Sequence, residues 1–196
     1  MKNLMNLKKE LNFEKNSIFT SKSNVLKLLK KQIKLSQIEK ILDFTIDDWQ
    51  KNKNFFLSQI ATNFPNKKVI IRSSAIGEDS AKNSEAGSYE SILNINSNSK
   101  AQLISAINHV INSYKEKNNL NNNNQILVQT QTLEIITSGV IFTRTLDLAL
   151  PYYVINYEEG KSTVGVTQGS VNETIKISRH PNSKILTKKW NLLLSK

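Results

Sequence analysis

The spacing of apolar residues divides the chain into a first part with a helical period and a second part with the two-residue period of strands. Helices are predicted over 21–33 and 45–64, because apolar side chains recur there every three or four residues. Another helix is predicted to begin at Ser99, where Gln102 completes a capping-box pattern ahead of an apolar stripe. An amphipathic helix is also expected over 183–196.

Strands are predicted on both sides of the Ser99 helix. Two precede it, "KKVIIRSS" (67–74) and "SYESILNI" (88–95). Beyond the polar loop 118–124, short alternating runs are separated by Gly, Pro and acidic turns: "QILVQTQ", "SGVIFTRT", "PYYVINYE", "STVGVTQG" and "NETIKIS". This order indicates an α+β fold in two halves, 1–117 and 125–196, the second an antiparallel meander.

Composition narrows the functional classes. The formal net charge of +11 invites a nucleic-acid interpretation. The lysines are scattered, however, whereas nucleic-acid binding requires basic clusters with interleaved aromatic residues, so we expect no nucleic-acid partner. The absence of cysteine excludes disulfides and thiolate metal sites. No apolar run approaches the ~20 residues of a membrane span and the N-terminus lacks a signal-peptide core, so a cytoplasmic protein without a membrane partner is expected.

The segment 69–95, "VIIRSSAIGEDSAKNSEAGSYESILNI", carries the candidate chemistry. Arg72 ends a strand, and its guanidinium can hold two phosphate oxygens at once, which the abundant lysines cannot copy. Gly87 lacks a Cβ and allows the backbone to approach a phosphate closely. The simpler alternative is a surface loop in which Arg72 pairs with Glu78 or Asp79.

Three stretches resemble one known family. "VIIRSSAIGEDS…SEAGSYESILNI" resembles the "VRSSA-x-x-ED…AG-x-x-x-S/T-x-L-N" signature of the nucleotide-binding domain shared by phosphoenolpyruvate synthase, pyruvate phosphate dikinase and rifampicin phosphotransferase. "ILVQTQTLEIITSGVIFTRT" is similar to that family's "VLVQ-x-M…SGV-x-F-T" strands. "FTSKSNVLKLL" resembles its "GGK-x-x-x-L" element, with Lys22 in the lysine place but without the two glycines. The resemblance spans roughly 18–170.

The resemblance implies an ATP-grasp-like fold, in which two α/β subdomains with mainly antiparallel sheets clamp ATP. It also implies an ATP-dependent phosphotransferase. In the family, ATP phosphorylates a histidine on a separate swivelling domain, and that histidine delivers the phosphate to an acceptor domain. ATP, the phosphohistidine domain and the acceptor domain are therefore the expected partners.

The family's site residues carry over to five positions. Arg72 would grip the phosphates and act in catalysis, Lys22 would contact them as a point charge, and Gly87 would lie in the loop over them. Ser91 stands at the place of a ligand-contacting Ser/Thr, and Gln129 would face the nucleotide from the second half. Two alternatives stay open from the residues alone: Lys22 as a solvated lysine at a helix start, and Gln129 as an ordinary polar strand residue.

One branch of the family matches a further stretch. "PYYVINYEEGKSTVGVTQGS" resembles "PYYVINYD…S-x-T-x-x-VTSG" in the kinases that phosphorylate the side-chain amide of L-glutamine for capsular phosphoramidate synthesis. The implied reaction converts ATP, L-glutamine and water to L-glutamine phosphate, AMP and phosphate. Phosphoenolpyruvate synthase, with pyruvate as acceptor, and a non-catalytic nucleotide-binding module are the alternatives.

The family's Mg²⁺ ligands, an "E-x-E" strand and a following "Q-x-R", have no match in the chain, so Mg²⁺ is expected to be bound by residues downstream. The histidines, His109 and His180, lack the small-residue context of a phosphocarrier histidine and are expected to be structural or surface residues. We therefore expect an N-terminal fragment of a longer enzyme, inactive alone, with no metal site of its own.

Overall fold

The computed structural model describes residues 21–76, 90–160 and 173–180 and divides the chain into two compact units, Met1–Thr132 and Leu133–Lys196. The predicted helix over 183–196, the strand "STVGVTQG" and Gly87 lie outside the described residues. The two units are described separately below.

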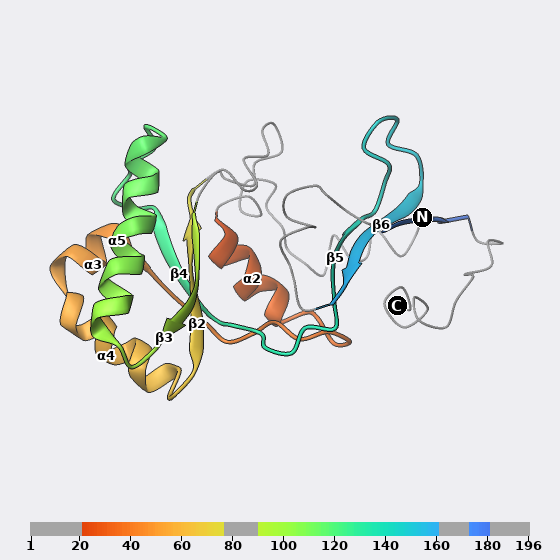
Figure 1. The fold of residues 1–196 in the computed structure, drawn as a ribbon. Coiled ribbons are helices and arrows are strands. Elements are labelled where there is room, and N and C mark those ends of the chain that lie inside the picture. The colour runs from red at the N-terminus through yellow and green to blue at the C-terminus, as the bar shows by residue number, and fades with distance from the viewer. Residues whose placement is uncertain (1–20, 77–89, 161–172, 181–196) are drawn as a thin grey trace. The chain divides into compact units, whose positions relative to one another are not determined.

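The first unit is built on a four-stranded antiparallel sheet. Its strands are β1 (Ile41–Thr45), β2 (Lys68–Ser74), β3 (Ser91–Asn96) and β4 (Gln125–Thr130), in the order β1-β4-β2-β3. The helices are α2 (Lys22–Lys30), α3 (Ile46–Lys51), α4 (Lys53–Asn63) and α5 (Lys100–Glu116). Figure 1 shows α3, α4 and α5 on one side of the sheet and α2 on the other.

The hydrophobic core of this unit lies between the sheet and α3, α4 and α5. Alternate strand residues point into it, among them Val69 and Ile71 of β2 and Ile126 and Val128 of β4, all of which are fully buried. Because strand side chains alternate between faces, the intervening residues of β2 and β4 point towards the side that carries α2. This alternation places Arg72 and Ser74 of β2 and Gln125 and Gln129 of β4 on the α2 face.

The predicted helix over 45–64 is instead a strand end followed by two helices. Thr45 closes β1 and caps α3, since its Oγ1 accepts the Asp48 N–H at 3.0 Å while Asp48 Oδ2 accepts the Thr45 N–H at 3.1 Å. Asn52 leaves the helical conformation (φ −136°) and separates α3 from α4. Strand β1 was not expected, because its five residues are too short for a period to stand out.

Two further predictions, the capping box of α5 and the place of β4, differ from the structure in part. Ser99 caps α5 as predicted, but the Gln102 side chain accepts from the Asn96 N–H rather than completing a reciprocal capping box. Strand β4, which the pattern grouped with the later strands in 125–196, pairs with both β1 and β2. The polar loop over 118–124 therefore connects α5 to a strand in the interior of the first sheet, and it does not separate the two units.

The second unit contains the three-stranded antiparallel sheet β5-β6-β7, from β5 (Thr137–Phe142), β6 (Tyr152–Glu159) and β7 (Glu173–Ser178). A small apolar cluster forms around Ile155, Tyr157 and Ile177. A Cβ at Gly139 would lie 2.7 Å from the backbone oxygen of Asn156, so β5 needs a glycine to approach β6 this closely. Helices together with antiparallel sheets confirm the predicted α+β class.

Candidate phosphate-binding face

Three of the predicted site residues project from one face of the first sheet. Arg72 lies directly opposite Ser91 on β3, so both side chains point to the same side. Gln129 on β4 lies opposite Ile70, which shares the face of Arg72 because the two are separated by one residue on β2. The register thus gathers Arg72, Ser91 and Gln129 on the face away from the core.

The Arg72 guanidinium contacts Gln129 directly. Its Nη1 donates a hydrogen bond to Gln129 Oε1 at 3.3 Å, and both side chains are half-buried. Within the described part of the chain no carboxylate forms an ion pair with Arg72, and Gln129 is its only side-chain hydrogen-bond partner, so most of the five guanidinium N–H donors are not used. The alternative partners Glu78 and Asp79, like Gly87, lie outside the described residues.

Lys22 is the first residue of α2, and the start of this helix docks on the same face. The Ser23 N–H donates to Ser74 Oγ at 2.9 Å, and Ser74 shares the face of Arg72 from two residues further along β2. Ser21 caps the helix, and its hydroxyl donates to Gln125 Oε1 at 2.6 Å. Lys22 is thereby held at the end of the strand that carries Arg72.

A second contact holds α2 further along. Lys27 Nζ lies 2.6 Å from an oxygen of Asp43, whose side chain is only 8% exposed. Asp43 Oδ2 also accepts from Gln125 Nε2 at 3.2 Å. Because Asp43 lies opposite Leu127, which in turn lies opposite Arg72, its carboxylate projects from the Arg72 face as well.

Tyr114 reinforces the strand ends beneath this face. Its hydroxyl accepts the Ser74 N–H at 2.7 Å and donates to the backbone oxygen of Gln125 at 2.8 Å. From sequence, Tyr114 was counted only among the apolar residues of its helix, Ser74 only as a hydroxyl near Arg72, and Asp43 and Gln125 were not singled out. The available signal was weak, namely polar side chains at the ends of otherwise apolar strands.

The face therefore combines the guanidinium of Arg72 with the hydroxyl of Ser91 and the amide of Gln129, and Lys22 is the first residue of the helix that docks on it. Such a set of donors suits the oxygens of a phosphate chain. In the described residues no group of three or more His, Cys, Asp or Glu side chains is arranged to hold a metal ion. None of the described helices has the length and apolar character needed to cross a membrane.

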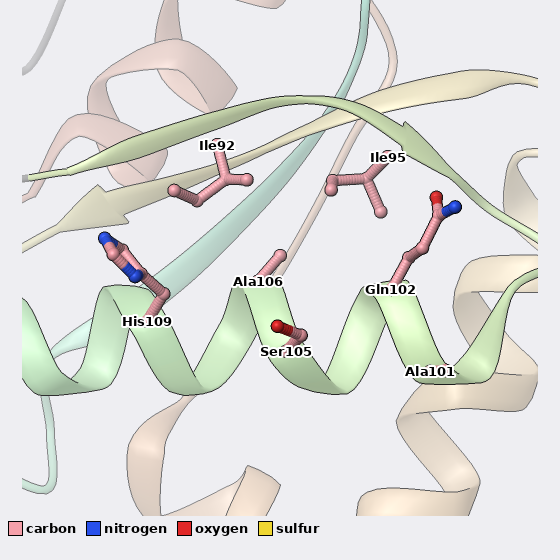
Figure 2. Close-up of a pocket in the computed structure, with 7 residues that line it drawn as sticks. All are labelled: Ile92, Ile95, Ala101, Gln102, Ser105, Ala106 and His109. Atoms are coloured by element: carbon pink, nitrogen blue, oxygen red, sulfur yellow. The ribbon is translucent and has the colours of Figure 1, made fainter.

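A separate groove of about 410 Å³ lies between β3 and α5. Figure 2 shows Ile92 and Ile95 of β3 facing Ala106 and His109 of α5 across it. Ile92 adjoins Ile71 in the register and so belongs to the core face, opposite to that of Arg72. With mainly apolar walls and no lysine or arginine in its lining, this groove does not suit a phosphate chain.

Comparison with family models identifies the family of the chain. A search of curated proteins found no match. The family model described as "Pyruvate phosphate dikinase, AMP/ATP-binding domain" matches residues 14–191. This match covers α2, β2, β3 and β4, the elements that carry Lys22, Arg72, Ser91 and Gln129. The chain therefore belongs to the pyruvate phosphate dikinase AMP/ATP-binding domain family, the nucleotide-binding module of enzymes of the pyruvate phosphate dikinase and phosphoenolpyruvate synthase type.

Proposed function

We propose that the chain holds the phosphates of ATP on the Arg72 face and so prepares the nucleotide for phosphoryl transfer. The observation that carries this proposal is the placement of Arg72: on an interior strand, opposite Ser91, bonded to Gln129 and without a carboxylate partner in the described residues. A half-buried arginine with unused donors is well suited to an anionic ligand, because its fork contacts two oxygens at once.

Each residue then has a distinct task. Arg72 stabilises the charge that develops on the transferring phosphoryl group and is the catalytic residue. Lys22 adds a point charge from the start of α2, Ser91 donates its hydroxyl to the phosphates, and Gln129 both orients Arg72 and faces the nucleotide. Gly87 is assigned to the loop over the phosphates on the family resemblance.

The described residues do not fit a Mg²⁺ site. Mg²⁺ prefers several oxygen ligands, usually including carboxylates. Asp43, a carboxylate on this face, is engaged by Lys27 and Gln125. Mg²⁺ bound to the triphosphate is therefore assigned to ligands supplied elsewhere in the enzyme, and no step is derived through it.

We further propose that the phosphoryl group passes to a histidine of a swivelling domain and from there to L-glutamine. The support is the likeness of residues 151–170 to the glutamine-phosphorylating branch. The full-length enzyme, incubated with Mg·ATP and L-glutamine, should release AMP, phosphate and a phosphoramidate visible by ³¹P NMR. Phosphoenolpyruvate formed from pyruvate instead would redirect the proposal to that acceptor. ATP binding without turnover on either acceptor would indicate a non-catalytic module.

The site itself is tested by thermal unfolding with and without millimolar Mg·ATP. Nucleotide at ~100-fold over its Kd should stabilise the unaltered chain by about 2.7 kcal/mol. Arg72→Ala should lose this shift. Arg144→Ala is the matched control, because Arg144 is an exposed arginine whose Nη1 bonds the Ala149 backbone oxygen in a turn of the second unit. Equal shifts in both variants would refute the assignment of Arg72.

A further inference from the structure

Lys22 lies between two serines that are both fixed to the sheet. Ser21 is 3% exposed and Ser23 is fully buried. The Ser21 hydroxyl accepts the Asn24 N–H at 3.3 Å and donates to Gln125 Oε1 at 2.6 Å, while the Ser23 N–H donates to Ser74 Oγ at 2.9 Å. With both neighbours held, the backbone of Lys22 has little freedom to move.

The Gln125 amide is itself oriented by Asp43. An ionised carboxylate only accepts hydrogen bonds, so the Gln125 nitrogen must face Asp43, where Nε2 lies 3.2 Å from Oδ2. This leaves Oε1 to accept from the Ser21 hydroxyl. Lys27, on the same helix as Lys22, lies 2.6 Å from Asp43 and fixes α2 to the carboxylate a second time.

We propose that Ser21, held by Gln125 and Asp43, is a positioning residue for Lys22; the proposal rests on the proposed function, in which Lys22 contacts the phosphates. In the element that this segment resembles, two glycines precede the lysine, and Ser21 stands in place of the second. A glycine leaves the backbone free. A serine bonded to the sheet holds the backbone from which the Lys22 side chain extends, so less of the chain has to be ordered when the nucleotide binds.

The test measures the dissociation constants of Mg·ATP and adenosine for Ser21→Ala, Lys22→Gln, the double variant and Ser21→Thr. Loss of the Lys22 charge should weaken Mg·ATP binding by about tenfold, the size of one charge-assisted contact, and leave adenosine unchanged. Ser21→Ala should weaken Mg·ATP nearly as much. The double variant should be no weaker than Lys22→Gln alone, because Ser21 acts through Lys22. Ser21→Thr keeps the hydroxyl and should restore binding.

Ser99→Ala is the matched control. Ser99 also caps a helix, accepting the Gln102 N–H at 3.4 Å, but α5 packs on the core face of the sheet. It should cost similar stability, about 1 kcal/mol, with no change in the ratio of Mg·ATP to adenosine affinity. Amide exchange gives a readout without nucleotide: Ser21→Ala should speed exchange at Ser23 and Asn24, and Ser99→Ala should not.

The outcomes separate the inference from the function on which it rests. If the unaltered chain binds no Mg·ATP, the proposed function of the chain is wrong. If Lys22→Gln binds Mg·ATP as tightly as the unaltered chain, the proposed role of Lys22 is wrong, and the positioning role of Ser21 is overturned with it. If Lys22→Gln weakens binding but Ser21→Ala does not, only the positioning role is overturned. Additive losses in the double variant would equally overturn it, because Ser21 would then act independently of Lys22.

Discussion

The hydroxyl of Tyr114 offers the sharpest test of how the phosphate-binding face is supported. Tyr114 is fully buried, and its Oη bonds two backbone groups, the Ser74 N–H at 2.7 Å and the Gln125 carbonyl at 2.8 Å. Tyr114→Phe keeps the ring and removes only the oxygen. Both backbone groups then lose a partner at the ends of the two central strands.

The expected cost follows from these two groups. Ser74 is fully buried, so its N–H cannot turn to water, and a buried donor without a partner costs about 1–3 kcal/mol. The Gln125 carbonyl is less affected, because a carbonyl oxygen has a second lone pair. Together they predict a loss of about 2–3 kcal/mol in the free energy of unfolding, or roughly 5–10 °C in Tm for a chain of this size.

The assay is urea unfolding followed by circular dichroism at 222 nm, because all the described helices belong to the first unit. Tyr152→Phe is the matched control: the same atom is removed from a half-buried tyrosine whose hydroxyl makes no hydrogen bond within the described residues. The control should change stability by less than about 0.5 kcal/mol. A Tyr114→Phe value equally small would refute the reasoning, since the backbone groups would then have found other partners.

Two further predictions concern local geometry. Gly139→Ala should destabilise the β5–β6 pair by about 1–3 kcal/mol, because the new Cβ meets the Asn156 carbonyl at 2.7 Å; faster amide exchange in β6 would show it, and unchanged exchange would contradict it. Hydrogen bonds from the Thr45 hydroxyl and N–H lower the pKa of Asp48 from its ordinary value of 3.8. The ionised carboxylate therefore stabilises the folded chain above about pH 3.8, and this stabilisation is lost as the pH falls through the lowered pKa. Asp48→Asn should flatten this acid dependence of unfolding, and an unchanged pH profile would exclude Asp48 as its source.

The sequence predicted the parts of the fold that depend on local pattern. Strand β2, the cap at Ser99 and the stripe of α5 were all found, because each is encoded within a few neighbouring residues. The α+β class and the nucleotide-binding family followed from motifs. Strand β1 and the division of 45–64 into α3 and α4 were missed, since five residues carry too little periodicity and the cap of α3 doubles as a strand end.

The candidate site could be predicted only in outline. Arg72, Ser91 and Gln129 were proposed from motifs, and the register places them on one face. The residues that hold Lys22 beside them could not be found this way. Ser21 meets Gln125 across 104 positions of the chain, and Gln125 meets Asp43 across 82. Contacts between polar residues so far apart leave no local signal, because only the assembled sheet brings them together.

The place of β4 between β1 and β2 has a consequence for the order in which the first unit can fold. β1 and β2 do not touch each other in the sheet; each pairs with β4, the last strand of the unit to be synthesised. Long loops must close before these pairings form, which slows folding. The nascent chain can assemble β2 with β3 early, but the two halves of its sheet join only after Thr130 has left the ribosome. A chain shortened to residue 117, where the pattern alone suggested a boundary, would lack the strand that joins them.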